Sequence, residues 1–225
     1  MKYIIFDIDG TLTNTTKVDD ECYIDAFEAL FTTSIKDVKW NQLSNVTDWG
    51  ITEELILSKL KRKSSSEEIL SLKKLFLKNL SDEYVSDKTQ FKEIKGASSF
   101  YKSLLNNNKL KIGIATGGWE ETANFKLKVI GINPKNVSYC NSNQFKTREE
   151  ITLDVIKQLN SNSDIEPEEI IYFGDGEWDY KTCQKLNVRF IGIDSQNNGK
   201  LRNKGALEVY NNFQRSEMIL KSIMK

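Results

Sequence analysis

Short apolar runs alternate with helix-length segments along much of the chain. An apolar run predicts a strand buried on both faces of a parallel sheet, and apolar residues at helical spacing predict an amphipathic helix. The sequence predicts strands at residues 3–6, 110–115, 137–140, 170–173 and 188–193. It predicts helices at residues 119–130, from residue 147 onward, at 177–186 and at 213–224. This alternation predicts an α/β fold with a mostly parallel sheet.

Residues 14–91 follow a different pattern, without a convincing strand-like run. Apolar residues fall on one face of each of two predicted helices. The first face carries Tyr23, Phe27, Leu30 and Phe31, and the second carries Ile69, Leu72, Phe76 and Leu80. Ser65 with Glu68 matches a capping box, which marks the start of a helix. We therefore expect an all-helical cap domain at residues 14–91, inserted into a core domain formed by residues 1–13 and 92–225.

The balance of charges argues against a polyanionic partner. The chain of 225 residues has 32 Lys and Arg and 32 Asp and Glu, so no net field attracts it to nucleic acid or to a membrane surface. No stretch approaches the ~20 apolar residues that a membrane span needs. The three cysteines are far apart, which is typical of free thiols in a reducing compartment. We expect a soluble cytoplasmic protein, either a monomer or a homodimer.

The chain contains no histidine. Serine–histidine and cysteine–histidine catalysis are therefore excluded, and so are metal sites built on histidine. Acid–base chemistry must come from carboxylates. A bound metal must accept oxygen ligands, which favours a hard ion such as Mg²⁺.

Two carboxylates, Asp7 and Asp9, directly follow the first predicted strand. A strand that ends in Asp-x-Asp-Gly presents both acids at the edge of the sheet where ligands of open α/β folds bind. An Asp-Gly pair alone is a common turn, but the whole sequence Asp7–Thr11 after a strand indicates a functional site. A calcium loop is a poor alternative, because its glycine and glutamate positions hold Leu12 and Val18.

The sequence Asp7–Thr11 resembles the first motif of the haloacid dehalogenase superfamily, in its phosphoglycolate phosphatase and β-phosphoglucomutase-like branch. The other motifs follow in the order of that family. Thr116 ends a predicted strand, and Arg148 opens a predicted helix. Asp175 and Asp179 come directly after a later strand. The resemblance implies a Rossmann-like three-layer core, with the helical cap between its first two motifs.

The resemblance also implies a role for each carboxylate. Asp7 would attack phosphorus and form an aspartyl phosphate, and Asp9 would act as general acid and then as general base. Dehalogenases of the family lack this second acid, so Asp9 favours a phosphate substrate. The implied Mg²⁺ ligands are Asp7, the backbone carbonyl of Asp9 and Asp175, with Asp179 as a further ligand or a water-mediated support.

The remaining motif positions concern the phosphoryl group. Thr116 is implied to hydrogen-bond it, with Thr11 and Gly117 assigned to the same phosphate site. Taken alone, Thr116 reads as a strand-end hydroxyl or a helix cap, and Arg148 as a solvated residue of a first helical turn. The family places a cation at the start of the helix that Arg148 opens, which makes Arg148 our choice. Lys146, two residues earlier, remains a competitor for this role and for phosphate binding.

These observations lead to one functional expectation with named rivals. We expect a Mg²⁺-dependent phosphatase that hydrolyses a small phosphorylated metabolite through an aspartyl phosphate. A phosphomutase of the same superfamily is the alternative, followed by a non-catalytic binding protein that keeps the fold. The stretch Thr47-Asp48-Trp49 lies between predicted cap helices, where it could contact the substrate, although packing is the alternative for a tryptophan.

Overall fold

The first strand, β1 (Lys2–Phe6), lies at the centre of a parallel sheet in the computed structural model, which describes residues 1–160 and 166–225. In this described part, the sheet has the strand order β3-β2-β1-β4-β5-β6. The other strands are β2 (Leu110–Ala115), β3 (Ser138–Cys140), β4 (Ile170–Gly174), β5 (Arg189–Ile193) and β6 (Val209–Tyr210). Phe6 is in register with Ile114 of β2 and Phe173 of β4. The last residues of β1, β2 and β4 therefore meet at one edge of the sheet.

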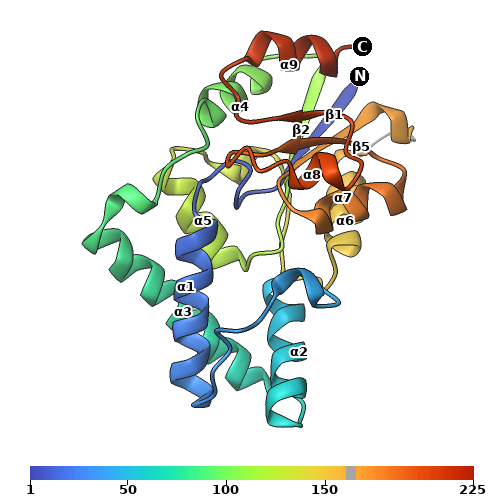
Figure 1. The fold of residues 1–225 in the computed structure, drawn as a ribbon. Helices are drawn as coiled ribbons and strands as arrows, with labels where there is room; N and C mark the ends of the chain where they lie inside the picture. Colours follow the sequence, from blue (N-terminus) through green and yellow to red (C-terminus); the bar gives the residue numbers. More distant parts are fainter. Residues whose placement is uncertain (161–165) are drawn as a thin grey trace.

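Helices cover both faces of this sheet (Figure 1). Alternate residues of a strand point to opposite faces, so Ile4 and Phe6 enter one apolar layer while Tyr3 and Ile5 enter the other. The first layer contains residues of α4 (Ala97–Leu105), α5 (Glu120–Val129) and α9 (Ser216–Ile223). The second contains residues of α6 (Arg148–Leu159), α7 (Glu177–Leu186) and α8 (Lys200–Asn203). The result is a three-layer α/β arrangement, as predicted.

Three further helices lie together at the end of the molecule opposite the two termini (Figure 1). They are α1 (Thr16–Phe31), α2 (Asp48–Leu60) and α3 (Ser66–Ser86). A third apolar cluster joins them, with Phe27 and Phe76 fully buried in it. Trp119, next to the start of α5, and Phe125 within it also pack into this cluster. The helices are thus held against the sheet-containing part through α5.

The predicted starts of two helices are confirmed by their capping geometry. The Ser65 hydroxyl accepts a hydrogen bond from the Glu68 N–H, and the Glu68 carboxylate accepts one from the Ser65 N–H. Thr147 and Glu150 make the same reciprocal pair at α6. Each pair satisfies two backbone donors that have no partner inside the helix, which stabilises the start of that helix.

Several predictions about the elements were wrong or incomplete. Leu30 is 36% exposed and does not share the buried face of α1, because the rings of Phe27 and Phe31, with centroids 4.6 Å apart, occupy the inward positions. The amphipathic helix α4 was not predicted, nor were the very short α8 and β6. The predicted free thiols are confirmed, since Cys22, Cys140 and Cys183 are buried and form no disulfide. Nowhere in residues 1–160 and 166–225 is a helix long and apolar enough to cross a membrane.

Candidate active site

The loop after β1 brings two carboxylates of distant strands together. Gly10 has a φ of +76°, a left-handed conformation that glycine adopts without strain. A Cβ atom at Gly10 would lie 2.3 Å from Cγ of Asp175, so only glycine lets that side chain approach. The Asp7 N–H donates to the Phe173 carbonyl at 2.9 Å, which fixes the end of β1 beside the end of β4. Asp7 and Asp175 therefore face each other across the sheet edge.

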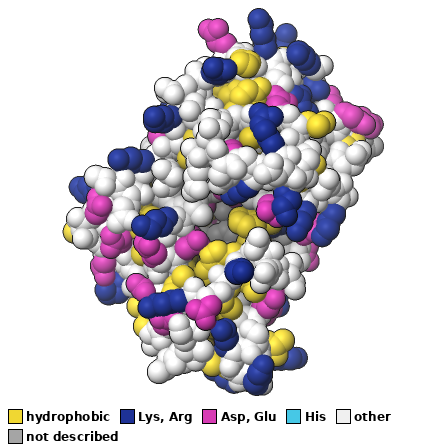
Figure 2. Space-filling view, viewed as in Figure 1, with side chains coloured by type: hydrophobic (Ala, Val, Ile, Leu, Met, Phe, Trp, Pro, Cys, Tyr) yellow, Lys and Arg dark blue, Asp and Glu magenta, His cyan; other side chains and the backbone are white. Residues whose placement is uncertain are grey.

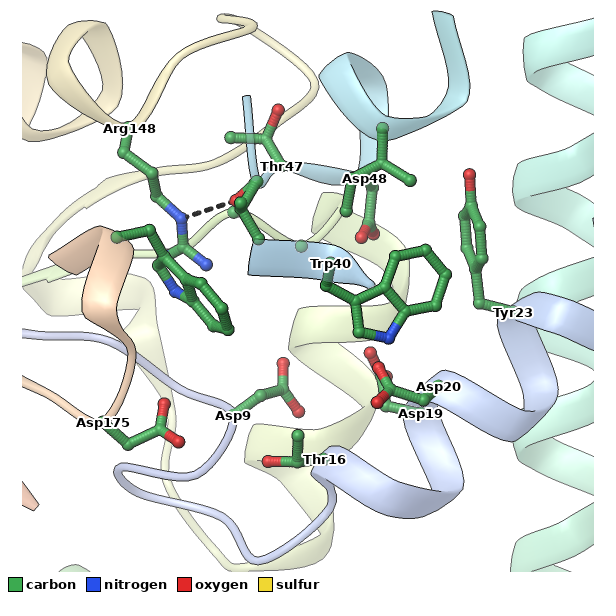
Figure 3. A pocket seen from close by; sticks show the side chains of 15 residues that line it. Asp9, Thr16, Asp19, Asp20, Tyr23, Trp40, Thr47, Asp48, Arg148 and Asp175 are labelled. Atoms are coloured by element: carbon green, nitrogen blue, oxygen red, sulfur yellow. Dashed lines mark hydrogen bonds between the residues drawn. The ribbon is translucent and has the colours of Figure 1, made fainter. Parts of the chain in front are cut away.

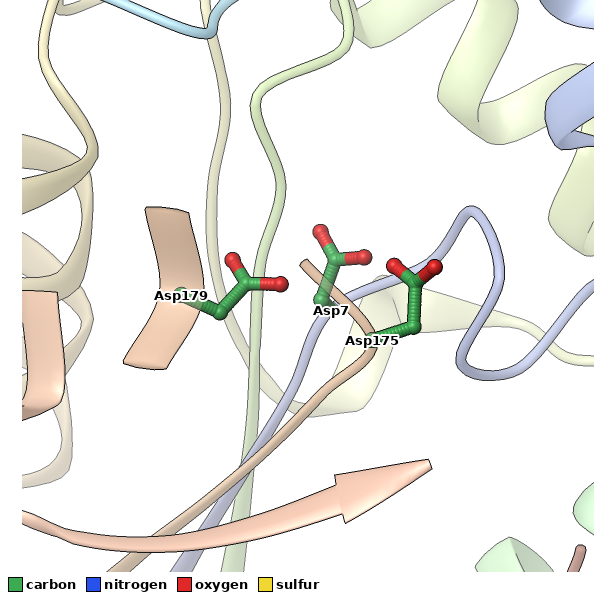
Figure 4. Close-up of side chains that lie close together, drawn as sticks. All are labelled: Asp7, Asp175 and Asp179. Carbon is green, nitrogen blue, oxygen red and sulfur yellow. The ribbon is translucent and has the colours of Figure 1, made fainter. Parts of the chain in front are cut away.

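A third carboxylate, Asp179, completes this group from the first turn of α7 (Figure 4). One oxygen from each of Asp7, Asp175 and Asp179 lies within 4.8 Å of the other two. The Asp179 carboxylate accepts the Gly176 N–H at 3.0 Å, which holds it in place. A Cβ atom at Gly174 would lie 2.6 Å from that of Asp179, so glycine is again needed for the approach.

The electrostatics of these three acids favour a bound cation. Burial, and then repulsion from Asp179, raise the pKa of Asp7 to about 7. Burial also raises the pKa of Asp175 to about 7 and that of Asp179 to about 6. Each shift means that the charged form is short of compensation in the protein alone. Since the donors are all oxygen atoms, the three residues fit Mg²⁺.

Arg148 lies beside these acids, and Lys146 does not. Nη1 of Arg148 donates to Oδ1 of Asp7 at 2.8 Å and to Oδ1 of Asp179 at 3.2 Å. A Cβ atom at Gly117 would lie 2.6 Å from Nη2 of Arg148, so this glycine makes room for the guanidinium. Lys146 instead bonds both carboxylate oxygens of Glu53 in α2, at 2.7 and 2.9 Å.

Asp9 is held by two donors. The Thr15 hydroxyl donates to its Oδ1 at 2.7 Å, and Nζ of Lys126 donates to its Oδ2 at 2.6 Å. The same ammonium donates to Asp19 of α1 at 2.5 Å. Burial alone would lower the pKa of Lys126, but Asp19 and Asp9 outweigh it and raise the pKa. Lys126 thus keeps its charge although its side chain is fully buried.

Sequence reasoning missed Lys126, because a lysine in an amphipathic helix is usually solvated. The sequence did contain one indication that Lys126 is buried. Lys126 follows Thr122 and Ala123 at helical spacing, and all three lie on the buried face of α5. A lysine on an apolar helix face needs an acidic partner, because a buried charge is costly unless it is paired.

The two threonines assigned to phosphate binding lie deeper than expected. Thr116 is buried at the end of β2, and its hydroxyl accepts the Gly118 N–H at 3.1 Å. Thr11 is fully buried, and its hydroxyl has no hydrogen-bond partner within the described residues. Gly117 and Gly118 line the neighbouring cavity, whereas neither threonine is among its lining residues.

The cavity lies where the helices α1 and α2 meet the sheet edge (Figure 3). The surface is hollowed there, with hydrophobic side chains along the rim (Figure 2). The sheet side contributes Asp9, Gly117, Gly118, Arg148, Asp175 and Trp178. The helical side contributes Thr16, Asp19, Asp20, Tyr23, Trp40 and Asp48, among others. The candidate chemical groups and the helical segment therefore face the same space.

The stretch Thr47-Asp48-Trp49 does not lie between helices as expected, because Asp48 and Trp49 form the first turn of α2 and Thr47 caps it. This helix start contacts the loops at the sheet edge. The Thr47 hydroxyl donates to the Lys146 carbonyl at 2.6 Å. The Asp48 N–H donates to the Gly117 carbonyl at 2.7 Å, and its carboxylate accepts the Trp119 N–H at 2.8 Å. Thr47 and Asp48 line the cavity, whereas Trp49 packs beside it, under the Lys146 ammonium.

The profile of the haloacid dehalogenase-like hydrolases matches residues 4–193 of this chain. The chain belongs to this family. No curated protein matches the sequence of this family member. As a haloacid dehalogenase-like hydrolase, the chain is an enzyme whose fold is shared by phosphatases and phosphomutases.

Solved structures resemble this hydrolase along nearly its whole length. A hydrolase from Pseudomonas syringae is 19% identical with a TM-score of 0.77, and the match covers 99% of both chains. A β-phosphoglucomutase from Clostridium difficile is 21% identical with a TM-score of 0.74, covering 100% of this chain and 97% of that one. A putative phosphoglycolate phosphatase from Lactobacillus plantarum is 16% identical with a TM-score of 0.63, covering 98% of each. At these identities the likeness is one of fold.

Proposed function

We propose that this protein is a Mg²⁺-dependent phosphatase that hydrolyses a small phosphorylated metabolite through a phosphoryl group carried by Asp7. The observation that supports it most is the group of Asp7, Asp175 and Asp179, with oxygens within 4.8 Å of one another and Arg148 against two of them. Phosphoryl transfer depends on a nucleophile, on charge neutralisation and on positioning, and this group supplies all three.

The residues that would hold the ion are Asp7, Asp175 and the backbone carbonyl of Asp9, with Asp179 in support. When bound, Mg²⁺ supplies charge neutralisation for the phosphoryl oxygens. Arg148 contributes a fixed positive charge at the same place, held by the Val46 carbonyl as well as by the carboxylates. A cation fixed before the reaction stabilises developing negative charge without reorganisation.

In the first step, an oxygen of Asp7 attacks phosphorus and the bond from phosphorus to the leaving oxygen breaks. Asp9 gives its proton to that oxygen, so the leaving group departs as a neutral alcohol. In the second step, water attacks the phosphoryl group on Asp7 and loses a proton to Asp9. The bond between phosphorus and Asp7 breaks, and orthophosphate is released. Thr15 and Lys126 hold the Asp9 carboxylate at the cavity wall in its ionised form, the form that accepts the proton of water in the second step.

We further propose that residues 14–91 act as the cap of this site. The proposal is supported by the contacts of Thr47 and Asp48 with the loops at the sheet edge. A cap that closes over a small substrate excludes bulk water while a single water reaches the intermediate.

The test is orthophosphate release from p-nitrophenyl phosphate and from a panel of phosphorylated metabolites, with and without Mg²⁺. Asp7→Asn should reduce release by at least about 10³-fold, because it removes the nucleophile and keeps the shape of the side chain. The exposed Asp37→Asn is the control for loss of one negative charge. With p-nitrophenyl phosphate, whose nitrophenolate leaves without protonation, Asp9→Asn should let a phosphate adduct accumulate on the peptide that contains Asp7, detected by mass spectrometry.

Two results would contradict the proposal. Undiminished release by Asp7→Asn would exclude Asp7 as the nucleophile. Interconversion of sugar phosphates without net release of orthophosphate would assign the protein to the phosphomutases instead.

A further inference from the structure

The helical side of the cavity carries carboxylates and aromatic rings opposite the proposed catalytic group (Figure 3). We call this surface the acidic wall, formed by Asp19, Asp20, Asp48, Tyr23 and Trp40. It comes from α1, from the segment before α2 and from the first residue of α2. The part of a substrate that extends beyond its phosphate would lie against this wall.

Positive charge is scarce around the acidic wall. Within the described ranges, Arg148 is the one cationic side chain that lines the cavity, and it is engaged by Asp7 and Asp179. Lys126 does not line the cavity; its side chain is fully buried and pairs with Asp19 and with Asp9. Lys146 is turned to Glu53. The wall therefore carries more negative than positive charge, with three carboxylates and the single ammonium of Lys126.

Two of the wall carboxylates have only neutral hydrogen-bond donors. Asp20 is bonded by the Trp40 side chain, and Asp48 by the Trp119 N–H. No lysine or arginine of the described residues forms an ion pair with either of them. Burial raises the pKa of Asp20 to about 6 and that of Asp48 to about 6, so the charged form of each lacks full compensation within the protein.

The rings add a second feature that suits a cation. Trp40 is half-buried and lies edge to face with Tyr23, with ring centroids 6.0 Å apart. An aromatic face beside carboxylates attracts an ammonium group through both the ring quadrupole and charge. At the sheet side, Nε1 of Trp178 is buried with no partner in the described part of the chain, so a ligand acceptor there would satisfy it. A substrate with an anionic end and a cationic end matches both sides of the cavity.

We propose that the preferred substrate is the phosphate monoester of a small amino alcohol, whose ammonium group lies against the acidic wall. This inference rests on the proposed phosphatase function. The reaction cleaves the bond between phosphorus and the ester oxygen, and water supplies the atoms for orthophosphate and the free amino alcohol. A leaving group with a carboxylate or a second phosphate is disfavoured, because it would place negative charge against Asp20 and Asp48.

Three two-carbon esters that differ in charge test the proposal. They are O-phosphoethanolamine, 2-hydroxyethyl phosphate and phosphoglycolate, compared by kcat/KM for orthophosphate release with Mg²⁺. The ammonium ester should exceed the hydroxyl ester by about tenfold, because a charge-assisted hydrogen bond is worth more than a neutral one. The carboxylate ester should be the poorest of the three. Equal rates for the first two, or a preference for phosphoglycolate, would overturn the proposal.

Matched variants on one helix identify the source of the selectivity. Asp20→Asn keeps an acceptor for Trp40 but removes the charge, and it should lower the ratio of the ammonium to the hydroxyl ester about tenfold. Asp25→Asn removes a charge from an exposed position of α1 and should leave that ratio unchanged. An unchanged ratio in Asp20→Asn would overturn the role of the wall.

p-Nitrophenyl phosphate, which has no ammonium group, distinguishes a failure of the substrate proposal from a failure of the phosphatase proposal. If p-nitrophenyl phosphate is hydrolysed in an Asp7-dependent reaction but the three esters show no preference for the ammonium group, only the inference about substrate fails. If neither p-nitrophenyl phosphate nor any of the esters is hydrolysed, the phosphatase proposal fails, and the substrate proposal fails with it.

Discussion

Arg148 and Lys146 are two residues apart in sequence but have different electrostatic surroundings. Arg148→Ala should lower kcat by about 10²- to 10³-fold, because it removes a fixed positive charge beside Asp7. Lys146→Ala should change kcat by less than about tenfold, since its side chain is 44% exposed and its ammonium pairs with Glu53 at the surface. The measurement is kcat with p-nitrophenyl phosphate at saturating Mg²⁺, with circular dichroism to verify folding. A larger loss in Lys146→Ala would reverse the assignment.

Other residues of the site differ in how far the sequence could predict their position. Asp7 and Asp175 were predictable, because each directly follows an apolar strand. Parallel strands that end at the same edge of a sheet bring the residues after them together. The choice of Arg148 also has a local basis, because the capping box at Thr147 puts Arg148 in the helix and Lys146 before it. Lys126 could not be placed in this way, since its partners are 107 and 117 residues away and meet it only in the folded chain.

At the scale of the element, the turn after β1 depends on Gly10. Gly10→Ala should abolish activity and lower the free energy of unfolding by about 1–3 kcal/mol, because its Cβ atom would overlap the Asp175 carboxylate in addition to straining φ. Gly131→Ala is the matched control. Gly131 has a similar φ of +72°, but the nearest atom to its Cβ is the flexible end of Lys102 at 3.9 Å. Urea unfolding and kcat are measured for both variants. Gly131→Ala reports the backbone strain alone, and Gly10→Ala reports the strain plus the overlap with Asp175. Equal effects of the two substitutions would contradict this account.

Helix α5 connects the sheet-containing part to α1 through Lys126. Lys126→Met should lower the free energy of unfolding by about 3–5 kcal/mol, because it leaves Asp9 and Asp19 facing each other without their cation. Lys128→Met, an exposed position on the same helix, should have an effect within about 0.5 kcal/mol. Urea unfolding of both variants is the measurement. Equal stability of the two variants would show that the buried ion pairs contribute nothing net.

Elements differ in how clearly the sequence predicts them. Long amphipathic helices and buried strands carry strong periodic signals. The bounds of α7, β4 and β5 agree with the prediction within one or two residues, and α6 begins one residue after its predicted start. The four-residue α8 and the two-residue β6 are too short for a periodic signal, and their backbone is fixed by neighbours such as β5. Contacts made only in the folded chain thus determine the elements that the pattern missed.

At the scale of the whole molecule, the sequence predicts a helical insertion and a parallel sheet, but not how they are joined. The predicted boundary at residue 91 rests on the end of the helical pattern in the sequence. Trp119 and Phe125, far beyond that boundary, pack with Phe76 and Tyr84 of α3. The apolar cluster of the three helices therefore includes residues of the sheet-containing part. A movement of α3 relative to the sheet-containing part would therefore have to disrupt these aromatic contacts, unless α5 moved with it.

The stability of the whole molecule should depend on Mg²⁺ and on pH together. Raised pKa values near 7 for Asp7 and Asp175 mean that, without metal, the folded state binds more protons than the unfolded state between about pH 4 and 7. The metal-free protein should therefore lose stability as the pH rises through this window. At about pH 8 both acids are ionised and free to bind the ion, whereas at about pH 5.5 protons compete with it.

We therefore expect a larger rise of the melting temperature by Mg²⁺ at about pH 8 than at about pH 5.5. Mg²⁺ at 100 times its dissociation constant adds about 2.7 kcal/mol to the free energy of unfolding. For a chain of this size, that corresponds to a rise of the melting temperature by about 5–10 °C. Asp175→Asn should remove most of the rise, and EDTA should reverse it in the unmodified protein. Because the melting temperature is read without substrate, this measurement tests the metal site independently of turnover. If the rise persisted in Asp175→Asn, the ion would have to bind somewhere other than at the three carboxylates.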